Sequence, residues 1–139
     1  MRQYNSVNLL EKIIAAATYL TAGMAGFIWF IIAALLKKSV TSFLMFHIMQ
    51  SIFISIAYFL FIELYKLIFV ILIKIPLINS MFMFFNGLIF NPLPIFWGMS
   101  LFQIFTTSVI LYLAITAFIG IYSYIPWVSD IIKNNTGSR

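Results

Sequence analysis

The sequence has no cysteine and very little charge, and each shortage excludes a class of protein. Without cysteine the chain cannot form disulfides, thiolate metal sites or a cysteine nucleophile. Charged residues make up 8% of the 139 residues, whereas a soluble globular domain carries about 25%. So few charges cannot keep a folded surface hydrated. With 64% hydrophobic residues and a mean hydropathy of +1.12, the chain is predicted to reside in lipid.

Acidic residues are the scarcest charges, and the net charge is therefore +5. The eight cations lie at the edges of apolar runs and form no continuous basic stripe, so we expect no nucleic-acid partner. They are expected to contact anionic lipid headgroups and to set the membrane topology. The predicted partners are the lipid bilayer and either other membrane proteins or further copies of this chain. No cofactor is expected.

Three apolar runs are long enough to cross a membrane as helices. The first contains no charge over 24 residues and would reach about 36 Å as a helix. The predicted spans are 13–36, 42–62 and 97–124. We therefore predict an all-α integral membrane bundle, with one transmembrane domain over 13–127 between a polar segment, 1–12, and a polar tail, 128–139.

The region between the second and third spans, 64–95, has more than one interpretation. Lys66 and Lys74 are eight residues apart, a spacing that suits an amphipathic helix at the membrane interface. Alternatively, the second helix continues to Ile75, and Pro76 ends it because proline lacks a backbone N–H. A re-entrant segment or a short fourth span is also compatible with the sequence that follows.

Polar side chains recur at helical spacing on two spans. On the second span, three of them follow an i, i+4, i+8 pattern and a glutamine borders the same face. The two predicted polar faces comprise His47, Gln50, Ser51, Ser55, Ser100, Gln103 and Thr107. Polar groups in lipid need partners, so these faces should point into the bundle or a wet cavity. These side chains could form hydrogen bonds between helices or line a pore.

Other motifs indicate helix packing and no catalytic or metal site. Ala22 and Gly26 are four residues apart, a spacing that lets helix backbones approach closely. His47 is the only histidine, and the three carboxylates lie near span ends, so neither a metal site nor a nucleophile–base pair can be assembled. We expect a structural hydrogen bond from His47, with a proton relay or substrate contact as the alternative. The chain is predicted not to be an enzyme.

Three segments together resemble a known family: residues 11–20 (EKIIAAATYL), 42–50 (SFLMFHIMQ) and 122–130 (YSYIPWVSD). Their order and spacing are similar to those of the family that contains the twenty-kilodalton channel subunit of the chloroplast inner-envelope protein-import translocon, together with its bacterial relatives. The motif residues are Phe43, Phe46, His47, Gln50, Tyr124, Ile125, Pro126 and Ser129. Plant and cyanobacterial members have two spans before the middle segment, whereas the apolar pattern here predicts one.

The resemblance implies a helical membrane protein without enzymatic activity, one that helps to form a protein-conducting passage with partner subunits. It also implies residence in a bacterial inner membrane or a plastid-type inner envelope membrane. A second hypothesis, from the residues alone, is a small homo-oligomeric channel or transporter for ions or solutes, with His47 and Gln50 at its pore.

Overall fold

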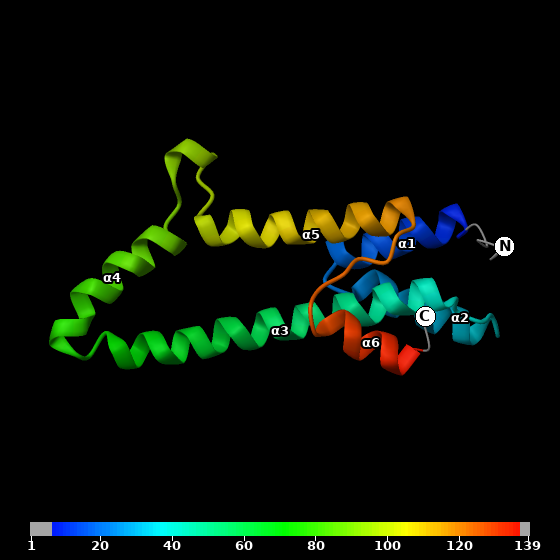
Figure 1. Ribbon diagram of the computed structural model, residues 1–139, viewed down its shortest axis with the longest axis horizontal. Helices are drawn as coiled ribbons and strands as arrows, with labels where there is room; N and C mark the ends of the chain where they lie inside the picture. The colour runs from blue at the N-terminus through cyan, green and yellow to red at the C-terminus, as the bar shows by residue number, and fades with distance from the viewer. Residues whose placement is uncertain (1–6, 137–139) are drawn as a thin grey trace. The chain divides into compact units, whose positions relative to one another are not determined.

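The computed structural model describes residues 7–136, and within that range the chain is helical (Figure 1). The elements are α1 (Leu9–Leu20), α2 (Met24–Leu35), α3 (Ser42–Leu72), α4 (Pro76–Phe90), the short 3-10 helix η1 (Pro94–Phe96), α5 (Leu101–Ile119) and α6 (Val128–Thr136). The described residues form no strand, and Leu93 and Met99 make one isolated bridge. The all-α prediction is confirmed. Parts of the predicted polar segments, 1–6 and 137–139, lie outside the described residues.

The chain divides into two compact units. Unit 1 comprises Met1–Ile56 and Ile110–Arg139, and unit 2 comprises Ala57–Val109. Helices α3 and α5 each begin in one unit and end in the other. The polar residues with the greatest burial belong to unit 1, with Ser100 as the exception.

The first predicted span, 13–36, is two helices rather than one. The chain doubles back between α1 and α2, which are in contact with each other (Figure 1). Each has 12 residues and a length of about 18 Å, too short for a hydrocarbon core about 30 Å thick. A continuous helix over this run was therefore the wrong prediction, although its apolar composition was read correctly.

Hydroxyl groups and left-handed residues produce this break. Ala22 and Gly23 have φ values of 52° and 94°, which end α1. The Thr21 Oγ1 donates to the Ala17 carbonyl and accepts from the Ala25 N–H, so it satisfies backbone groups on both sides of the turn. The Thr18 carbonyl accepts from the Gly23 N–H at 2.8 Å. A break inside an apolar run is tolerated because these groups are satisfied.

Two helices are long and apolar enough to cross a membrane, namely α3 with 31 residues and α5 with 19. Their most apolar stretches are 0% and 17% buried, which distinguishes them from core helices of a soluble protein. The prediction of three spans plus a fourth is not confirmed, because α2 and α4 have only 12 and 15 residues.

The ambiguous region 64–95 supplies the end of α3, all of α4 and the first two residues of η1. Helix α3 passes beyond the predicted end at 62 and stops at Leu72, close to the Ile75 of the alternative interpretation. Pro76 is the first residue of α4, where its missing N–H costs nothing. Inside unit 2 the Tyr65 hydroxyl donates to the Asn86 side-chain oxygen, and the Tyr65 ring lies 4.5 Å from that of Phe90.

Lys12 ties α1 to the end of α5 within unit 1. Its Nζ donates to the Ile119 carbonyl at 3.1 Å. Gly120, at φ 97°, ends α5 in a Schellman motif, in which the Ile121 N–H donates to the Thr116 carbonyl at 3.0 Å. A Cβ on Gly120 would lie 2.7 Å from the Lys12 Cε, so the glycine leaves room for the lysine. The ammonium group also complements the negative end of the α5 dipole.

We expect Lys12→Met to lower the free energy of unfolding by about 1 kcal/mol, because the substitution removes a cation from a helix C-terminus and leaves a carbonyl without its donor. Unfolding by titration with sodium dodecyl sulfate in mixed micelles measures the change. Lys74→Met is the matched control, since Lys74 is exposed. Equal effects of the two substitutions would show that the cap does not stabilise the fold.

Candidate functional site: a buried polar network

Unit 1 contains a group of polar side chains that are almost completely shielded. Each is at most 5% exposed, although the surrounding chain is strongly apolar. The members of this buried polar network are Thr18, Tyr19, His47, Gln50, Ser51, Ser123 and Ser129. They come from α1, from the first turns of α3, from the segment between α5 and α6, and from α6. The network therefore joins parts of the chain that lie more than 70 residues apart.

Gln50 is the centre of the network. Its Oε1 accepts from the Tyr19 hydroxyl at 2.6 Å and from the Ser123 hydroxyl at 2.7 Å. Its Nε2 donates to Ser129 Oγ at 3.0 Å and to the Ser123 carbonyl at 3.4 Å. One side chain thus uses both donors and both lone pairs. It connects α1 and the C-terminal part of the chain to α3.

The hydrogen bonds of Gln50 also fix the proton on His47. The Tyr19 hydroxyl has one proton and gives it to Gln50, so at 2.8 Å from His47 Nδ1 it must act as acceptor. His47 is then the tautomer that carries its proton on Nδ1. Its Nε2 is buried with no hydrogen-bond partner among the described residues.

Aromatic rings enclose the imidazole of His47. Phe43 and Phe46 approach it edge-on, with ring centroids at 4.5 and 5.3 Å, and Tyr122 stacks against it at 6.1 Å. Tyr122 also contacts the rings of Phe43 and Phe46 at 5.5 and 5.1 Å. Both phenylalanines are buried. Edge-on and stacked contacts between rings stabilise a fold by more than their buried area alone. The aromatic cage formed by Phe43, Phe46 and Tyr122 therefore holds the His47 ring in one orientation.

The predicted small-residue contact holds for Gly26 and fails for Ala22. A Cβ on Gly26 would lie 2.7 Å from the Ile48 Cγ1 and 2.8 Å from the Thr18 Cγ2, so α2 approaches both α1 and α3 closely there. Ala22 is exposed and forms the turn between α1 and α2. Beside this contact the Ser51 hydroxyl donates to the Thr18 carbonyl at 3.0 Å, which satisfies the end of α1 from α3.

The first predicted polar face is largely brought together. His47, Gln50 and Ser51 are buried in the network, whereas Ser55, one turn further along α3, is only half-buried. The face points into the protein, as its polarity in an apolar helix required. Its partners are Tyr19 and the two C-terminal serines rather than a second polar helix.

The second predicted polar face has a different role at its first two positions. The Ser100 Oγ accepts from the Gln103 N–H at 3.2 Å, and the Gln103 Oε1 accepts from the Ser100 N–H at 2.9 Å. This reciprocal pair is a capping box at the start of α5. Gln103 and Thr107 are exposed. The S-x-x-Q spacing in the sequence is typical of a capping box. The prediction of a shared polar face overlooked this alternative.

The C-terminal motif contributes through its two serines. Ser129 is fully buried, and its Oγ accepts from the Ile125 N–H at 2.7 Å. Tyr124 and Pro126 are exposed, and the Tyr124 hydroxyl donates to Asp130 at 3.3 Å. The negative charge of Asp130 raises the pKa of the Tyr124 phenol. Tyr19 and Ser123 were missed as partners because no periodic pattern links them to Gln50.

The hydrogen bonds of the network join helices to one another. Among the described residues, no group of three or more histidine, cysteine or carboxylate side chains could hold a metal ion. The serine hydroxyls of the network are hydrogen-bonded to Gln50 or to backbone carbonyls, and the His47 Nδ1 faces Tyr19. The network therefore links α1, α3 and α6 through side chains that have their own partners.

We expect His47→Phe to change the free energy of unfolding by less than about 1 kcal/mol, because a ring of similar shape keeps the aromatic cage and removes the unpartnered Nε2. His47→Ala should lower it by about 3 kcal/mol, because a cavity replaces the ring. Thermal unfolding in detergent measures both. Equal losses in the two variants would assign His47 a role that depends on its nitrogen atoms.

No protein-family model, no curated protein and no solved structure matches this chain. The resemblance to the import-translocon family therefore rests on the three sequence segments and stays a prediction. The geometry of those segments, described above, is an observation independent of that resemblance.

Proposed function

We propose that the chain is a non-enzymatic, integral membrane subunit of a complex that translocates proteins across a bacterial inner membrane or a plastid-type inner envelope membrane. The observation that carries the proposal is the convergence of the three motif segments. Tyr19 comes from the first segment, His47 and Gln50 from the second, and Ser123 and Ser129 from the third. Segments that resemble one family by sequence thus supply the residues of one network.

The helix order gives further support. Two helices, α1 and α2, precede the middle segment, which begins α3. The family members in plants and cyanobacteria have two spans before that segment. The number of helices before the middle segment therefore agrees with the family, whereas their length of 12 residues each does not.

The outer surface favours a protein that lies in lipid beside other subunits. Large apolar side chains are exposed along both long helices, for example Phe59 and Phe105 at 61% and 66%. In water such surfaces would drive aggregation. In a bilayer they contact acyl chains or the apolar faces of partner helices. A pore of the kind in the second hypothesis needs polar groups free to meet ions, and Gln50 has none free.

The proposal is tested by site-specific photo-crosslinking in the host membrane. A photoreactive amino acid is placed at Phe105, an exposed position of α5 outside the polar network. A precursor protein arrested during transport should crosslink to this position, and depletion of the chain should slow import or export of that precursor. Mild-detergent isolation should return additional membrane proteins with the chain.

The matched control places the same photoreactive residue at Leu113, which is fully buried. A chain that copurifies with no partner, crosslinks no precursor at Phe105 and can be depleted without a transport defect would contradict the proposal. Flux of ions through reconstituted vesicles that is abolished by His47→Phe as well as by His47→Ala would instead favour the channel hypothesis, because phenylalanine keeps the ring and removes its nitrogen atoms.

A further inference from the structure

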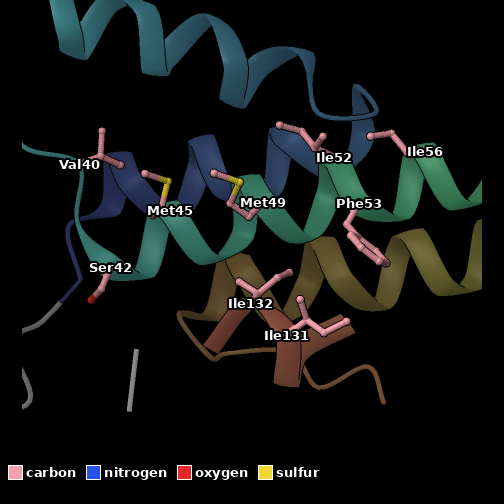
Figure 2. Close-up of a pocket in the computed structure, with 9 residues that line it drawn as sticks. All are labelled: Val40, Ser42, Met45, Met49, Ile52, Phe53, Ile56, Ile131 and Ile132. Atoms are coloured by element: carbon pink, nitrogen blue, oxygen red, sulfur yellow. The ribbon is translucent and has the colours of Figure 1, made fainter. Parts of the chain in front are cut away.

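We propose that unit 1 carries a binding site for one anionic glycerophospholipid, with an acyl chain in a groove between α3 and α6 and the headgroup at Lys37 and Lys38. The groove has a volume of about 640 Å³ and is formed by residues of unit 1 (Figure 2). The site is independent of the proposed function, because it requires no partner subunit.

The lining of the groove is apolar along nearly its whole length. Side chains of α3 form one wall, and two isoleucines of α6 lie opposite them (Figure 2). The residues that define its course are Val40, Met45, Met49, Phe53, Ile131 and Ile132. Methionine side chains are flexible and adapt to irregular hydrocarbon shapes. The polar member of the lining, Ser42, lies at the end where α3 begins.

The length of the groove fits one acyl chain. From Ser42 to Ile56 the groove follows α3 for about 21 Å. A lipid leaflet has a hydrocarbon depth of about 15 Å, so one acyl chain and its glycerol region can lie along this length.

The charge at the Ser42 end selects an anionic headgroup. Lys37 and Lys38 are exposed, and Lys38 lies two residues before Val40, at most about 7 Å away along the backbone. Lys37 is held in the left-handed region at φ 51° by a Schellman motif, in which the Lys38 N–H donates to the Ala33 carbonyl at 2.9 Å. This turn fixes the backbone of both lysines two and three residues before Val40, at the end of the groove. The nearest acidic residue along α6 is Asp130, and its carboxylate accepts a hydrogen bond from the Tyr124 hydroxyl.

Native mass spectrometry of the full chain in mild detergent tests the site with two probes, dioleoyl phosphatidylglycerol and dioleoyl phosphatidylcholine. One phosphatidylglycerol should remain bound per chain, with about tenfold higher affinity than phosphatidylcholine, because lysines near a lipid surface favour anionic headgroups. Lys37→Gln with Lys38→Gln should abolish this preference. The double substitution Lys66→Gln with Lys74→Gln is the matched control and should preserve it.

Filling the groove is the second arm of the experiment. Met49→Trp should weaken the retention of both lipids about tenfold, because the indole displaces roughly two methylene groups of the acyl chain. Met24→Trp, at an exposed methionine outside the groove, should leave retention unchanged. Equal retention of the two lipids by the parent chain, or retention unaffected by Met49→Trp, would overturn the proposal.

A different occupant would also overturn it. A dimer of the chain that disappears with Met49→Trp would assign the groove to a second copy. If Met49→Trp does not fold, the variant Lys37→Gln with Lys38→Gln tests the site alone, since both lysines lie in an exposed turn. An unchanged preference for phosphatidylglycerol in this double variant rejects the headgroup site. These measurements use the isolated chain and no partner subunit. A negative result for lipid binding therefore does not bear on the translocation proposal, and a negative result for translocation does not bear on lipid binding.

Discussion

Replacing Gln50 with leucine is expected to lower the free energy of unfolding by about 3 kcal/mol, as much as His47→Ala. Leucine matches the volume of glutamine but offers no hydrogen bond. The hydroxyls of Tyr19 and Ser123 lose their acceptor and Ser129 loses a donor, all in buried positions. A buried polar group without a partner costs about 1–3 kcal/mol, whereas a single hydrogen bond between membrane helices averages about 0.6 kcal/mol.

The matched control for this substitution is Gln103→Leu. Gln103 is exposed and caps α5 through Ser100, so its loss should cost about 1 kcal/mol, the usual value of a helix cap. Titration with sodium dodecyl sulfate in mixed micelles measures both variants. A loss for Gln50→Leu no larger than that for Gln103→Leu would mean that the buried network does not hold unit 1 together.

Gly26→Ala is expected to lower the free energy of unfolding by about 2 kcal/mol, although alanine is the better helix former. The added Cβ would lie 2.7 Å from Ile48 and 2.8 Å from Thr18. Both neighbours are β-branched and stiff, and the Thr18 hydroxyl is also held by the Ile14 carbonyl at 2.7 Å. Relief of the clash therefore requires α2 to move away from α1 and α3.

The same substitution should have the opposite sign at Gly87. This residue lies within α4, and a Cβ there would meet only the Asn91 Nδ2, at 3.3 Å. Gly87→Ala should therefore stabilise the chain by up to about 1 kcal/mol, through helix propensity alone. Circular dichroism during thermal unfolding follows both variants. Destabilisation of equal size at the two positions would rule out close helix contact as the cause at Gly26.

The sequence predicted those features that depend on periodicity and composition. Apolar runs identified the long helices α3 and α5, and the helical spacing of His47, Gln50 and Ser51 predicted a shared buried face. The partners of that face could not be predicted in the same way. Ser123 and Ser129 reach Gln50 through a segment with no regular secondary structure and a short helix, where no repeat relates a residue to its neighbours in space.

The errors arose where short polar signals competed with a long apolar pattern. The run 13–36 is uncharged, yet Thr18, Thr21 and Gly23 together satisfy a break inside it. Hydroxyl groups can bond to the backbone in helices or end them, so their presence alone did not decide between the two. Ser100 and Gln103 show the same ambiguity, since a three-residue spacing fits both a shared helix face and a capping box.

The turn between α1 and α2 also bears on which side of the membrane each end occupies. If this hairpin enters and leaves on one side, α3 and α5 are the crossings, and both chain ends share a compartment. Among the described lysines, Lys12, Lys37 and Lys38 then lie on that side, and Lys66 and Lys74 lie toward the other end of α3. The positive-inside rule relates the orientation of such a protein to this division of its lysines between the two sides.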